Sequence, residues 1–133
     1  MNIGTIKFLN QLKNASIKNE LQTTVVSNDL TQNLIKLLYR EGLIQSFKIR
    51  RIEGLNKTNS TEATILLRYR HEKATFSNLT IISTPAIQRY LSLNVIDRIS
   101  SKNVVFVFST SRGLLTLEKC KRYRIGGVLL FTC

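Results

Sequence analysis

The stretch that most constrains the fold runs from Asn103 to Leu117 and reads NVVFVFSTSRGLLTL. Val and Phe pack well on a pleated, half-buried surface, so we predict a β-strand over Val104–Phe108 inside a packed sheet. A polar segment, Ser109–Gly113, follows and separates this strand from a second apolar run. We therefore expect a loop that the packed sheet holds in place. It would present hydroxyl groups, a guanidinium group and, at Gly113, a backbone without a side chain to a ligand.

The charge of the chain indicates what kind of partner it binds. Of the 133 residues, 20 are Lys or Arg and 8 are Asp or Glu, which gives a net charge of +12 and a pI near 10.2. Such a surplus attracts polyanions, and nucleic acid is the leading candidate. The hydrophobic content of 43% is too high for a disordered basic tail. An anionic membrane surface would also attract this charge, but no apolar run approaches the roughly 18 residues of a membrane span and the basic residues are dispersed, so we expect no membrane partner. We expect no small-molecule substrate either.

Residues that could support catalysis or hold a metal are scarce. His71 is the single histidine, and Cys120 and Cys133 lack the spacing of a metal or redox motif. The acidic residues are scattered, without the pairing that an activated water needs. We therefore predict no enzyme activity, no metal and no cofactor. The N-terminal residues lack the features of a secretory or import signal, so we expect the protein to work where it is made, with its cysteines reduced.

Two helices are predicted in the first half of the chain. The first carries apolar residues at spacings of three and four, namely Ile6, Leu9, Leu12 and Ala15. Ser27 or Asn28 is a suitable N-cap for the second helix, and Gly42 a suitable stop. The apolar positions of the second helix are Leu30, Leu34, Leu37 and Leu38.

Short strands accompany these helices. We predict them over Thr23–Ser27, from Ile44 onward with a basic outer face, over Ala63–Arg70 and over Leu79–Ser83. The resulting order is α-β-α-β-β(-β), which predicts a small sheet covered on one face by two helices.

The segment Ser83–Ala86 contains the only proline and is the best candidate for a domain boundary. We predict an N-terminal α/β domain over residues 1–83 and a mainly β domain over residues 84–133. In the second domain we expect a short helical or irregular piece at Leu93–Ile99, a basic turn or helix at Thr116–Arg124, and a final strand over Val128–Thr132. The predicted fold class is thus α+β, with two small α/β domains.

Several segments together resemble one known family. They are LKNA at Leu12–Ala15, REGLI at Arg40–Ile44, STP at Ser83–Pro85 with Arg89-Tyr90 after it, STSRGLLT at Ser109–Thr116, and the pair Gly126-Gly127. Their order and spacing are similar to those of the bacterial-type eighth protein of the small ribosomal subunit, from about Lys7 to the C-terminus. The resemblance implies two α/β pieces that bind the central domain of small-subunit rRNA during assembly, with the small-subunit proteins two and five as neighbours.

The resemblance also implies an rRNA-binding site. Its main element corresponds to Ser109, Thr110, Ser111, Arg112 and Gly113, with Tyr90, Gly126 and Gly127 beside it and Lys13-Asn14 as a second contact in the N-terminal domain. This chain departs from the family at Val128, where an acidic residue commonly follows the double glycine, and at Ala86, which replaces a glycine. Glycines that commonly precede the central strand are replaced by Lys102, Asn103 and Val104. We leave Val128 out of the site.

The chemistry of the polar segment is suited to structured RNA. A-form RNA displays 2′-hydroxyls and phosphates on a shallow minor groove, which short donor–acceptor side chains can contact. Arg112 can bind a phosphate through two N–H groups, and Tyr90 can stack on an unpaired base. We expect further phosphate contacts from Arg89, Lys121, Arg122 and Arg124. On the residues alone, an ordinary β-turn and a packed tyrosine remain alternatives.

The predicted function is a structural role in the small ribosomal subunit. The alternative is a non-ribosomal RNA-binding protein that regulates translation. Frequent Asn, Ile and Lys with few Ala is typical of an A+T-rich genome, and with the bacterial-type resemblance it predicts a protein of the mitochondrial ribosome. A plastid or the bacterial cytoplasm is the alternative location.

Overall fold

Two helices form where the apolar spacing predicts them, in a computed structural model that describes residues 3–53, 59–70, 73–100 and 104–133. Helix α1 spans Ile3–Ile17 and helix α2 spans Asp29–Arg40. The side chain of Asn28 caps α2 by accepting a hydrogen bond from the Thr31 backbone N–H at 2.8 Å. Gly42, with a φ of +73°, follows the end of α2 in a left-handed conformation that suits glycine.

The chain divides into two compact units. The N-terminal unit is Lys7–Ser77, and the C-terminal unit is Asn78–Cys133 together with the start of the chain up to Ile6. The division falls between Ser77 and Asn78, a few residues before the boundary predicted at Ser83. The single histidine, His71, lies outside the described residues, as do Lys102 and Asn103.

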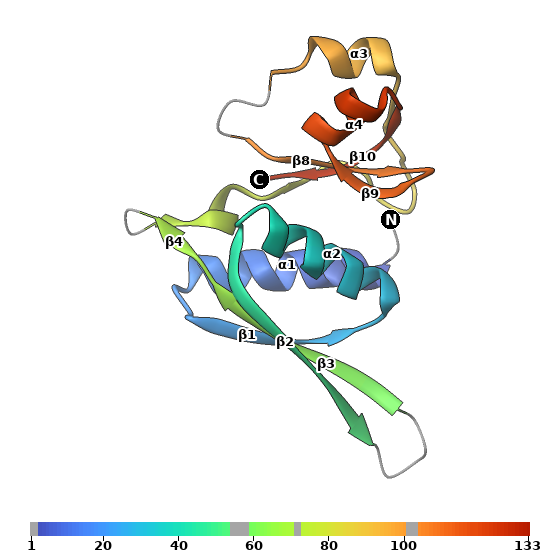
Figure 1. Cartoon of the computed structure of the whole chain (residues 1–133). Helices are drawn as coiled ribbons and strands as arrows, with labels where there is room; N and C mark the ends of the chain where they lie inside the picture. The colour runs from blue at the N-terminus through green and yellow to red at the C-terminus, as the bar shows by residue number, and fades with distance from the viewer. Residues whose placement is uncertain (1–2, 54–58, 71–72, 101–103) are drawn as a thin grey trace. The chain divides into compact units, whose positions relative to one another are not determined.

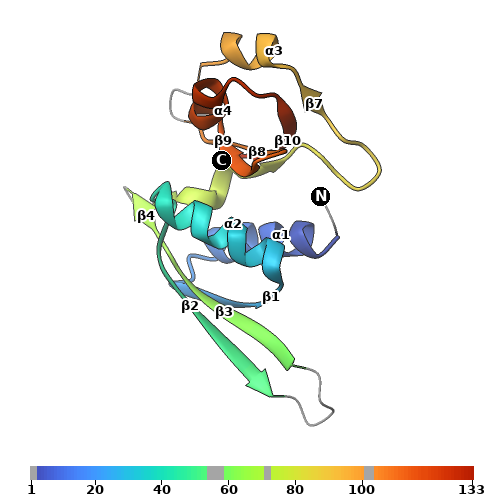
Figure 2. The same ribbon diagram turned by 45° about the vertical axis from the view of Figure 1, so that its right-hand side comes forward.

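The N-terminal unit is a three-stranded antiparallel sheet in the order β1-β3-β2. Its strands are β1 (Gln22–Ser27), β2 (Ile44–Glu53) and β3 (Asn59–Leu67). Both helices lie on one face of this sheet, and the β2–β3 hairpin extends beyond the short strand β1 (Figures 1 and 2). A short ribbon of β4 (Tyr69–Arg70) and β5 (Lys73–Ala74) follows, and then a 3₁₀ turn, η1, over Thr75–Asn78.

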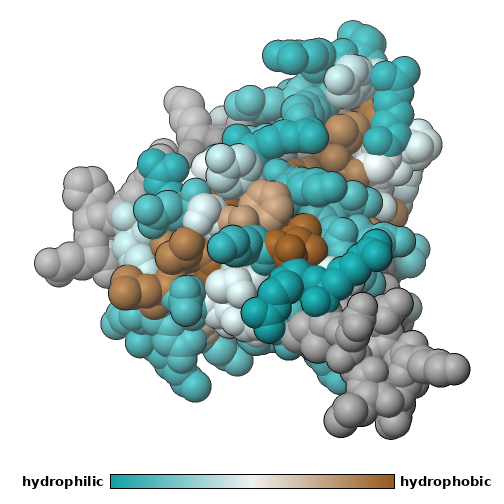
Figure 3. Space-filling view, turned by 60° about the horizontal axis from the view of Figure 1, so that its bottom comes forward, coloured by the Kyte–Doolittle hydropathy of each residue, from teal (hydrophilic) through white to brown (hydrophobic). Residues whose placement is uncertain are grey.

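The core of the N-terminal unit forms between the helices and the sheet. It buries Phe8, Leu9, Leu12 and Ala15 of α1, Leu34, Ile35, Leu37 and Leu38 of α2, and Val25, Ala63 and Ile65 of the sheet. The predicted apolar faces are thereby confirmed, except that Leu30 remains 38% exposed and Ile6 is only half-buried. The lower side of the molecule in Figure 1, where β1, β2 and β3 are drawn, presents polar surface with apolar patches (Figure 3). Val26, exposed to 73%, lies on β1.

The C-terminal unit is a five-stranded sheet with β10 (Gly127–Thr132) at its centre. Strands β6 (Thr80–Ile81), β7 (Tyr90–Leu91) and β8 (Phe106–Thr110) each pair antiparallel with β10, and β9 (Gly113–Thr116) pairs with β8. Two short helices, α3 (Leu93–Arg98) and α4 (Leu117–Tyr123), complete the unit. The mixed α+β fold class is confirmed.

The prediction that Leu79–Ser83 adds a strand to the N-terminal sheet is wrong. Its central part is β6, which pairs with β10 in the C-terminal sheet. The backbone N–H groups of Ile82 and Ser83 also donate to the carbonyl oxygen of Leu130, at 2.9 and 3.2 Å. A strand this short has too few side chains to specify its partner through hydrophobic pattern, so its sequence does not reveal which sheet it joins.

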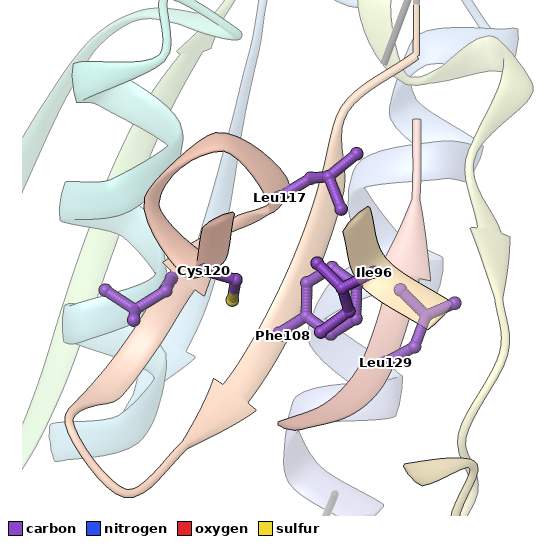
Figure 4. Close-up of a cluster of buried hydrophobic side chains, with 6 residues drawn as sticks. Ile96, Phe108, Leu117, Cys120 and Leu129 are labelled. Carbon is purple, nitrogen blue, oxygen red and sulfur yellow. The ribbon is translucent and has the colours of Figure 1, made fainter. Parts of the chain in front are cut away.

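The helices α3 and α4 cover one face of the C-terminal sheet. The buried cluster between them comprises Ile96, Phe108, Leu115, Leu117, Cys120 and Leu129, five of which are labelled in Figure 4. Burial raises the pKa of the Cys120 thiol, which behaves here as a small apolar side chain. Since side chains alternate along a regular strand, Ser109, Leu114 and Val128, each next to one of these buried residues, point to the opposite face of the sheet.

Candidate nucleic-acid interface

The segment predicted as a loop is instead a tight β-hairpin. Ser109 and Thr110 end β8, Ser111 and Arg112 form the turn, and Gly113 begins β9. The Thr110 hydroxyl donates to the Gly113 carbonyl oxygen at 2.9 Å and accepts from the Arg112 backbone N–H at 3.1 Å. Gly113 has a φ of +96°, as expected for a glycine that follows the turn in a hairpin. Pairing across the turn therefore draws the polar residues into the strands.

The three hydroxyl groups of the hairpin have different roles. That of Thr110 is occupied within the turn by the two hydrogen bonds above. Ser109 and Ser111 are exposed, and their hydroxyls have no partner within the part of the chain that the structure describes. Two of the three predicted hydroxyls are therefore available to a ligand, while the third shapes the turn.

Arg112 is held against the end of α4. Its guanidinium carbon lies 5.0 Å from the ring centroid of Tyr123, a cation–π contact. Both side chains are exposed, Tyr123 to 45%. The Arg112 side chain is exposed and no hydrogen bond to its guanidinium group is found in the described part of the chain, so its N–H groups remain suited to a phosphate.

The sheet register brings Tyr90 and Ser109 onto one face of the C-terminal sheet. Tyr90 is the partner of Val128, and Val128 is in turn the partner of Ser109. Directly opposite residues point to the same side of a sheet, so these three form a row across β7, β10 and β8. Tyr90 is 66% exposed, Ser109 is exposed and Val128 is half-buried. Sequence reasoning placed Tyr90 and Ser109 in the site but left out Val128, which lies between them.

Gly126 and Gly127 allow the neighbouring strands to approach closely. A Cβ on Gly127 would lie 2.8 Å from the Ser109 carbonyl oxygen and 2.7 Å from the Thr110 methyl carbon. A Cβ on Gly126 would lie 2.7 Å from the Leu91 carbonyl oxygen and 2.8 Å from the Tyr90 hydroxyl oxygen. Such distances are shorter than packed atoms tolerate, so these glycines hold the site together and need not touch a ligand.

Two further residues, Ser83 and Thr84, position the segment that carries Arg89 and Tyr90. The buried Ser83 hydroxyl donates to the Leu129 carbonyl oxygen and accepts from the Arg89 backbone N–H at 3.1 Å. The Thr84 hydroxyl accepts from the Ile87 backbone N–H at 3.2 Å. The sequence analysis used this segment as a boundary and as part of the family resemblance, but gave its hydroxyl groups no role. The signal available was a pair of short hydroxyl side chains before a proline, a composition typical of an ordered turn.

The basic residues around α4 are not equivalent. The Lys121 ammonium group donates to the Ile99 carbonyl oxygen at 2.5 Å and so links α4 to the end of α3. Arg122 and Arg124 are exposed, and Arg124 caps α4 with a φ of +55°. Arg89 is also exposed. The three arginines are therefore better placed than Lys121 for phosphate contacts.

The predicted second contact lies in the N-terminal unit. Lys13 is half-buried and Asn14 is exposed, both on α1. Asn14 lines a surface depression of about 400 Å³. The other lining residues are Lys7, Asn10, Gln11, Ala15, Lys18, Glu20 and Thr23. Amide groups and two lysines thus accompany Asn14, a set suited to a polar, anionic ligand.

Within the described ranges, no helix is long and apolar enough to cross a membrane. The same ranges contain no group of three or more His, Cys, Asp or Glu residues that could hold a metal ion.

The fold is that of a small basic α+β protein, and the β8–β9 hairpin and its neighbours expose hydroxyls, guanidinium groups and a tyrosine ring, groups that are suited to binding a polyanion. A family model described as ribosomal protein S8 matches residues 5–133. The chain therefore belongs to the ribosomal protein S8 family, whose members are structural ribosomal proteins and not enzymes.

Individual relatives agree with this assignment. The small ribosomal subunit protein uS8c of Nymphaea alba is 33% identical over 122 residues, which cover 90% of this chain and 89% of the relative. The small ribosomal subunit protein uS8 of Opitutus terrae is 30% identical over 123 residues and 92% of both chains. Membership implies a structural role in the ribosome, with small-subunit rRNA and ribosomal proteins as partners.

Proposed function

We propose that this protein binds the central domain of small-subunit rRNA and helps it to assemble. In this proposal the C-terminal unit makes the main contact, through a surface that we call the hairpin face. The hairpin face comprises Ser109, Ser111 and Tyr90, with Arg112 at the tip of the hairpin beside them. Arg89, Arg122 and Arg124 are proposed as further phosphate contacts of the C-terminal unit. The observation that carries the proposal is the register that aligns Tyr90 with Ser109 across three strands.

The chemistry of the hairpin face is suited to RNA. The free hydroxyls of Ser109 and Ser111 can donate to and accept from 2′-hydroxyls and base edges, which A-form RNA exposes in its minor groove. The arginines can bind phosphates, whose contacts supply most of the salt-dependent affinity. Hydrogen bonds of Thr110, Gly113 and Lys121, and the close approach of strands at Gly126 and Gly127, keep this surface in place.

Lys13 and Asn14 are proposed as a second rRNA contact, made by the N-terminal unit. The two units would then act as two separate RNA-binding domains, and the small-subunit proteins two and five would be neighbours in the assembled particle. This arrangement explains why exposed cations occur in both units while the hydroxyl-rich hairpin occurs in one.

The test is chemical footprinting of a small-subunit rRNA transcript from the same genome. Wild-type protein should protect an irregular helix in the central domain. A variant with Ser109→Ala, Ser111→Ala and Arg112→Gln should lose most of this protection while it keeps its circular dichroism spectrum. A matched variant with Thr24→Ala, Ser46→Ala and Lys48→Gln on the N-terminal sheet should retain it. Equal protection by the hairpin variant, or none by the wild type, would refute the proposal.

We further propose that the protein acts in the mitochondrial ribosome, as predicted from an amino-acid composition that is typical of an A+T-rich genome. The plant uS8c relatives and the bacterial relative instead support the plastid or bacterial alternative. Mass spectrometry of ribosomes purified separately from each organelle of the source organism would distinguish these locations. Recovery in plastid or cytoplasmic ribosomes alone would refute the mitochondrial proposal.

A further inference from the structure

We propose that a depression at one corner of the N-terminal unit binds an acidic side chain of a neighbouring ribosomal protein. The depression has a volume of about 630 Å³, and we call it the α2–β2 pocket. It forms where the end of α2, the start of β2 and strand β4 lie together (Figures 1 and 2). Its lining residues are Tyr39, Arg40, Gly42, Ile44, Gln45, Arg68 and Tyr69. This inference goes beyond the proposed rRNA contacts, which use none of these residues.

The positive charge of the α2–β2 pocket comes from two arginines. Arg40 is the last residue of α2, and Arg68 lies between β3 and β4; both are exposed. The Arg68 guanidinium group donates to the Gly42 carbonyl oxygen at 3.0 Å, which fixes its position at the end of α2. Among the described residues, no acidic side chain lines the pocket. Two guanidinium groups in one depression suit a carboxylate, which each can bind through paired N–H groups.

A β-bulge adds an amide group beside these arginines. The register pairs Ile44 with Leu67 and Ser46 with Leu66, so Gln45 is an extra residue on β2. A bulge of this kind removes its extra residue from the regular pairing and redirects the side chain. Gln45 is exposed, and among the described strands β2 has a partner on one side only. The Gln45 amide can therefore donate to and accept from a peptide group of an incoming chain.

Two tyrosines of the α2–β2 pocket are already held in place by the fold. The Tyr39 ring is 51% exposed, and its centroid lies 5.5 Å from that of Phe47 in an edge-to-face contact. The Tyr69 hydroxyl donates to the Glu20 carbonyl oxygen. A ligand that packs on such rings orders few side chains on binding. Tyrosine and arginine are enriched at protein–protein interfaces, where lysine is depleted, and no lysine is among the described lining residues.

Negative groups beside the α2–β2 pocket favour a protein ligand over RNA. The exposed Glu41 follows Arg40, and burial together with the nearby Glu20 carboxylate raises the pKa of Tyr69. The C-terminal end of α2 also carries a partial negative charge. An RNA strand bears a phosphate at every nucleotide, so a strand that crosses the pocket would be repelled by these groups. A single carboxylate between Arg40 and Arg68 is suited to the same surroundings.

The first experiment tests this chemistry with the free protein in solution. A blocked tripeptide with a central glutamate is titrated into ¹⁵N-labelled protein and followed by NMR. It should cause saturable shifts at the Gly42 and Gln45 amides and at the Arg68 guanidinium group. The same tripeptide with a central glutamine should bind about tenfold more weakly, because the charge-assisted hydrogen bonds are lost. Equal binding of the two peptides, or binding of a diribonucleotide alone, would overturn the inference.

The second experiment identifies the ligand in small subunits reconstituted with the protein. The photo-reactive amino acid p-benzoylphenylalanine replaces Gln45, and the cross-linked peptide is sequenced by mass spectrometry. We expect a cross-link to a ribosomal protein within a few residues of an Asp or Glu. Arg40→Glu in the same protein should lower the yield about tenfold, and replacing the partner's acidic residue by arginine should restore it. A cross-link to rRNA alone would overturn the inference.

The matched control is Lys48→Glu, which makes the same change of charge at an exposed residue of β2 outside the pocket lining. It should leave the cross-link and the tripeptide affinity unchanged, and an equal loss at Lys48 would show a general charge effect and overturn the inference. Arg40 is exposed at a helix end, so its replacement should leave the fold intact, which circular dichroism checks. If the protein does not enter small subunits, the structural role proposed above fails, whereas the NMR titration still decides whether the pocket binds a carboxylate.

Discussion

The Arg112 guanidinium carbon lies 5.0 Å from the ring centroid of Tyr123, so a cation–π contact joins the tip of the β8–β9 hairpin to the last residue of α4. Replacing Tyr123 by Leu removes the cation–π contact and keeps an apolar side chain. We expect a decrease of about 0.5–1 kcal/mol in the free energy of unfolding, typical of an exposed pair. Hydrogen exchange should also become faster at the amides of Ser111 and Arg112. Tyr123→Phe should retain both properties, and equal exchange rates in Leu and Phe variants would argue against the contact.

Gly127 should tolerate no side chain. Its Cβ would meet the backbone of Ser109 at 2.8 Å, and backbone cannot rotate away as a side chain can. Gly127→Ala is therefore expected to cost roughly 1–3 kcal/mol, as overpacking does in cores, measured by urea denaturation. Gly4→Ala is the matched control, since Gly4 is exposed in α1. There, alanine should stabilise or leave stability unchanged. Similar effects at both glycines would contradict the packing argument.

Asn28 should contribute to stability through its cap. Its side chain accepts the Thr31 N–H at 2.8 Å at the start of α2. Asn28→Ala should lower the free energy of unfolding by about 1 kcal/mol, whereas Asn28→Asp should preserve it. Thermal denaturation of both variants measures the difference, and an Asp variant as unstable as the Ala variant would show that the cap contributes little.

Stability should decline in alkaline solution because of Cys133. Burial raises the pKa of this thiol from its ordinary value near 9 to about 12. A folded-state pKa above that of the unfolded chain favours folding at low pH, because only the unfolded chain releases the proton readily. The contribution is therefore complete below pH 9 and disappears as the pH rises from 9 to 12. Cys133→Ala should flatten the pH dependence of urea stability in this window, and parallel curves for the two proteins would contradict the assignment.

Substitutions of Lys121 and Arg122 should affect different properties, namely the stability of the fold and the affinity for RNA. Lys121→Gln weakens the link to the Ile99 carbonyl oxygen and should mainly reduce stability. Arg122→Gln removes an exposed charge, so it should mainly reduce RNA affinity. The log–log salt dependence should then become shallower by roughly 0.7–0.9 for each phosphate that the variant no longer neutralises. The check is a salt titration of transcript binding with both variants, and the reverse pattern would refute this division.

The sequence predicts the N-terminal unit well because its signals are local. The helical spacing of Leu9 and Leu12, and the cap at Asn28, act within a few residues of the chain. In the C-terminal unit the predicted strand at Val104–Phe108 is found as β8, which begins at Phe106, and the final strand and short helices are also found, whereas the predicted loop at Ser109–Gly113 is a hairpin. The first residue of a strand is predicted less well than the strand itself, because the side-chain pattern indicates which residues face the core but not where pairing with the neighbouring strand begins.

What the sequence does not predict is the partnership between strands. Register alone shows that Val128 lies between Tyr90 and Ser109, and these residues are far apart in the chain. The sequence does not predict the β8–β9 hairpin for a similar reason. Ser109 and Thr110 are polar residues typical of a loop, and only their pairing with Leu114 and Gly113 shows that they belong to a strand. The internal role of the Thr110 hydroxyl likewise depends on a contact with Gly113 across the turn.

The central place of β10 has a consequence for the order of synthesis. Residues 22–67 suffice to form the three strands of the N-terminal sheet. In the other sheet, β6, β7 and β8 all pair with residues 127–132, which emerge from the translating ribosome after every other strand described. Domains near the N-terminus generally fold first during translation. A nascent chain should therefore carry a finished N-terminal unit, with its proposed second RNA contact, while the hairpin face of the C-terminal unit is still incomplete.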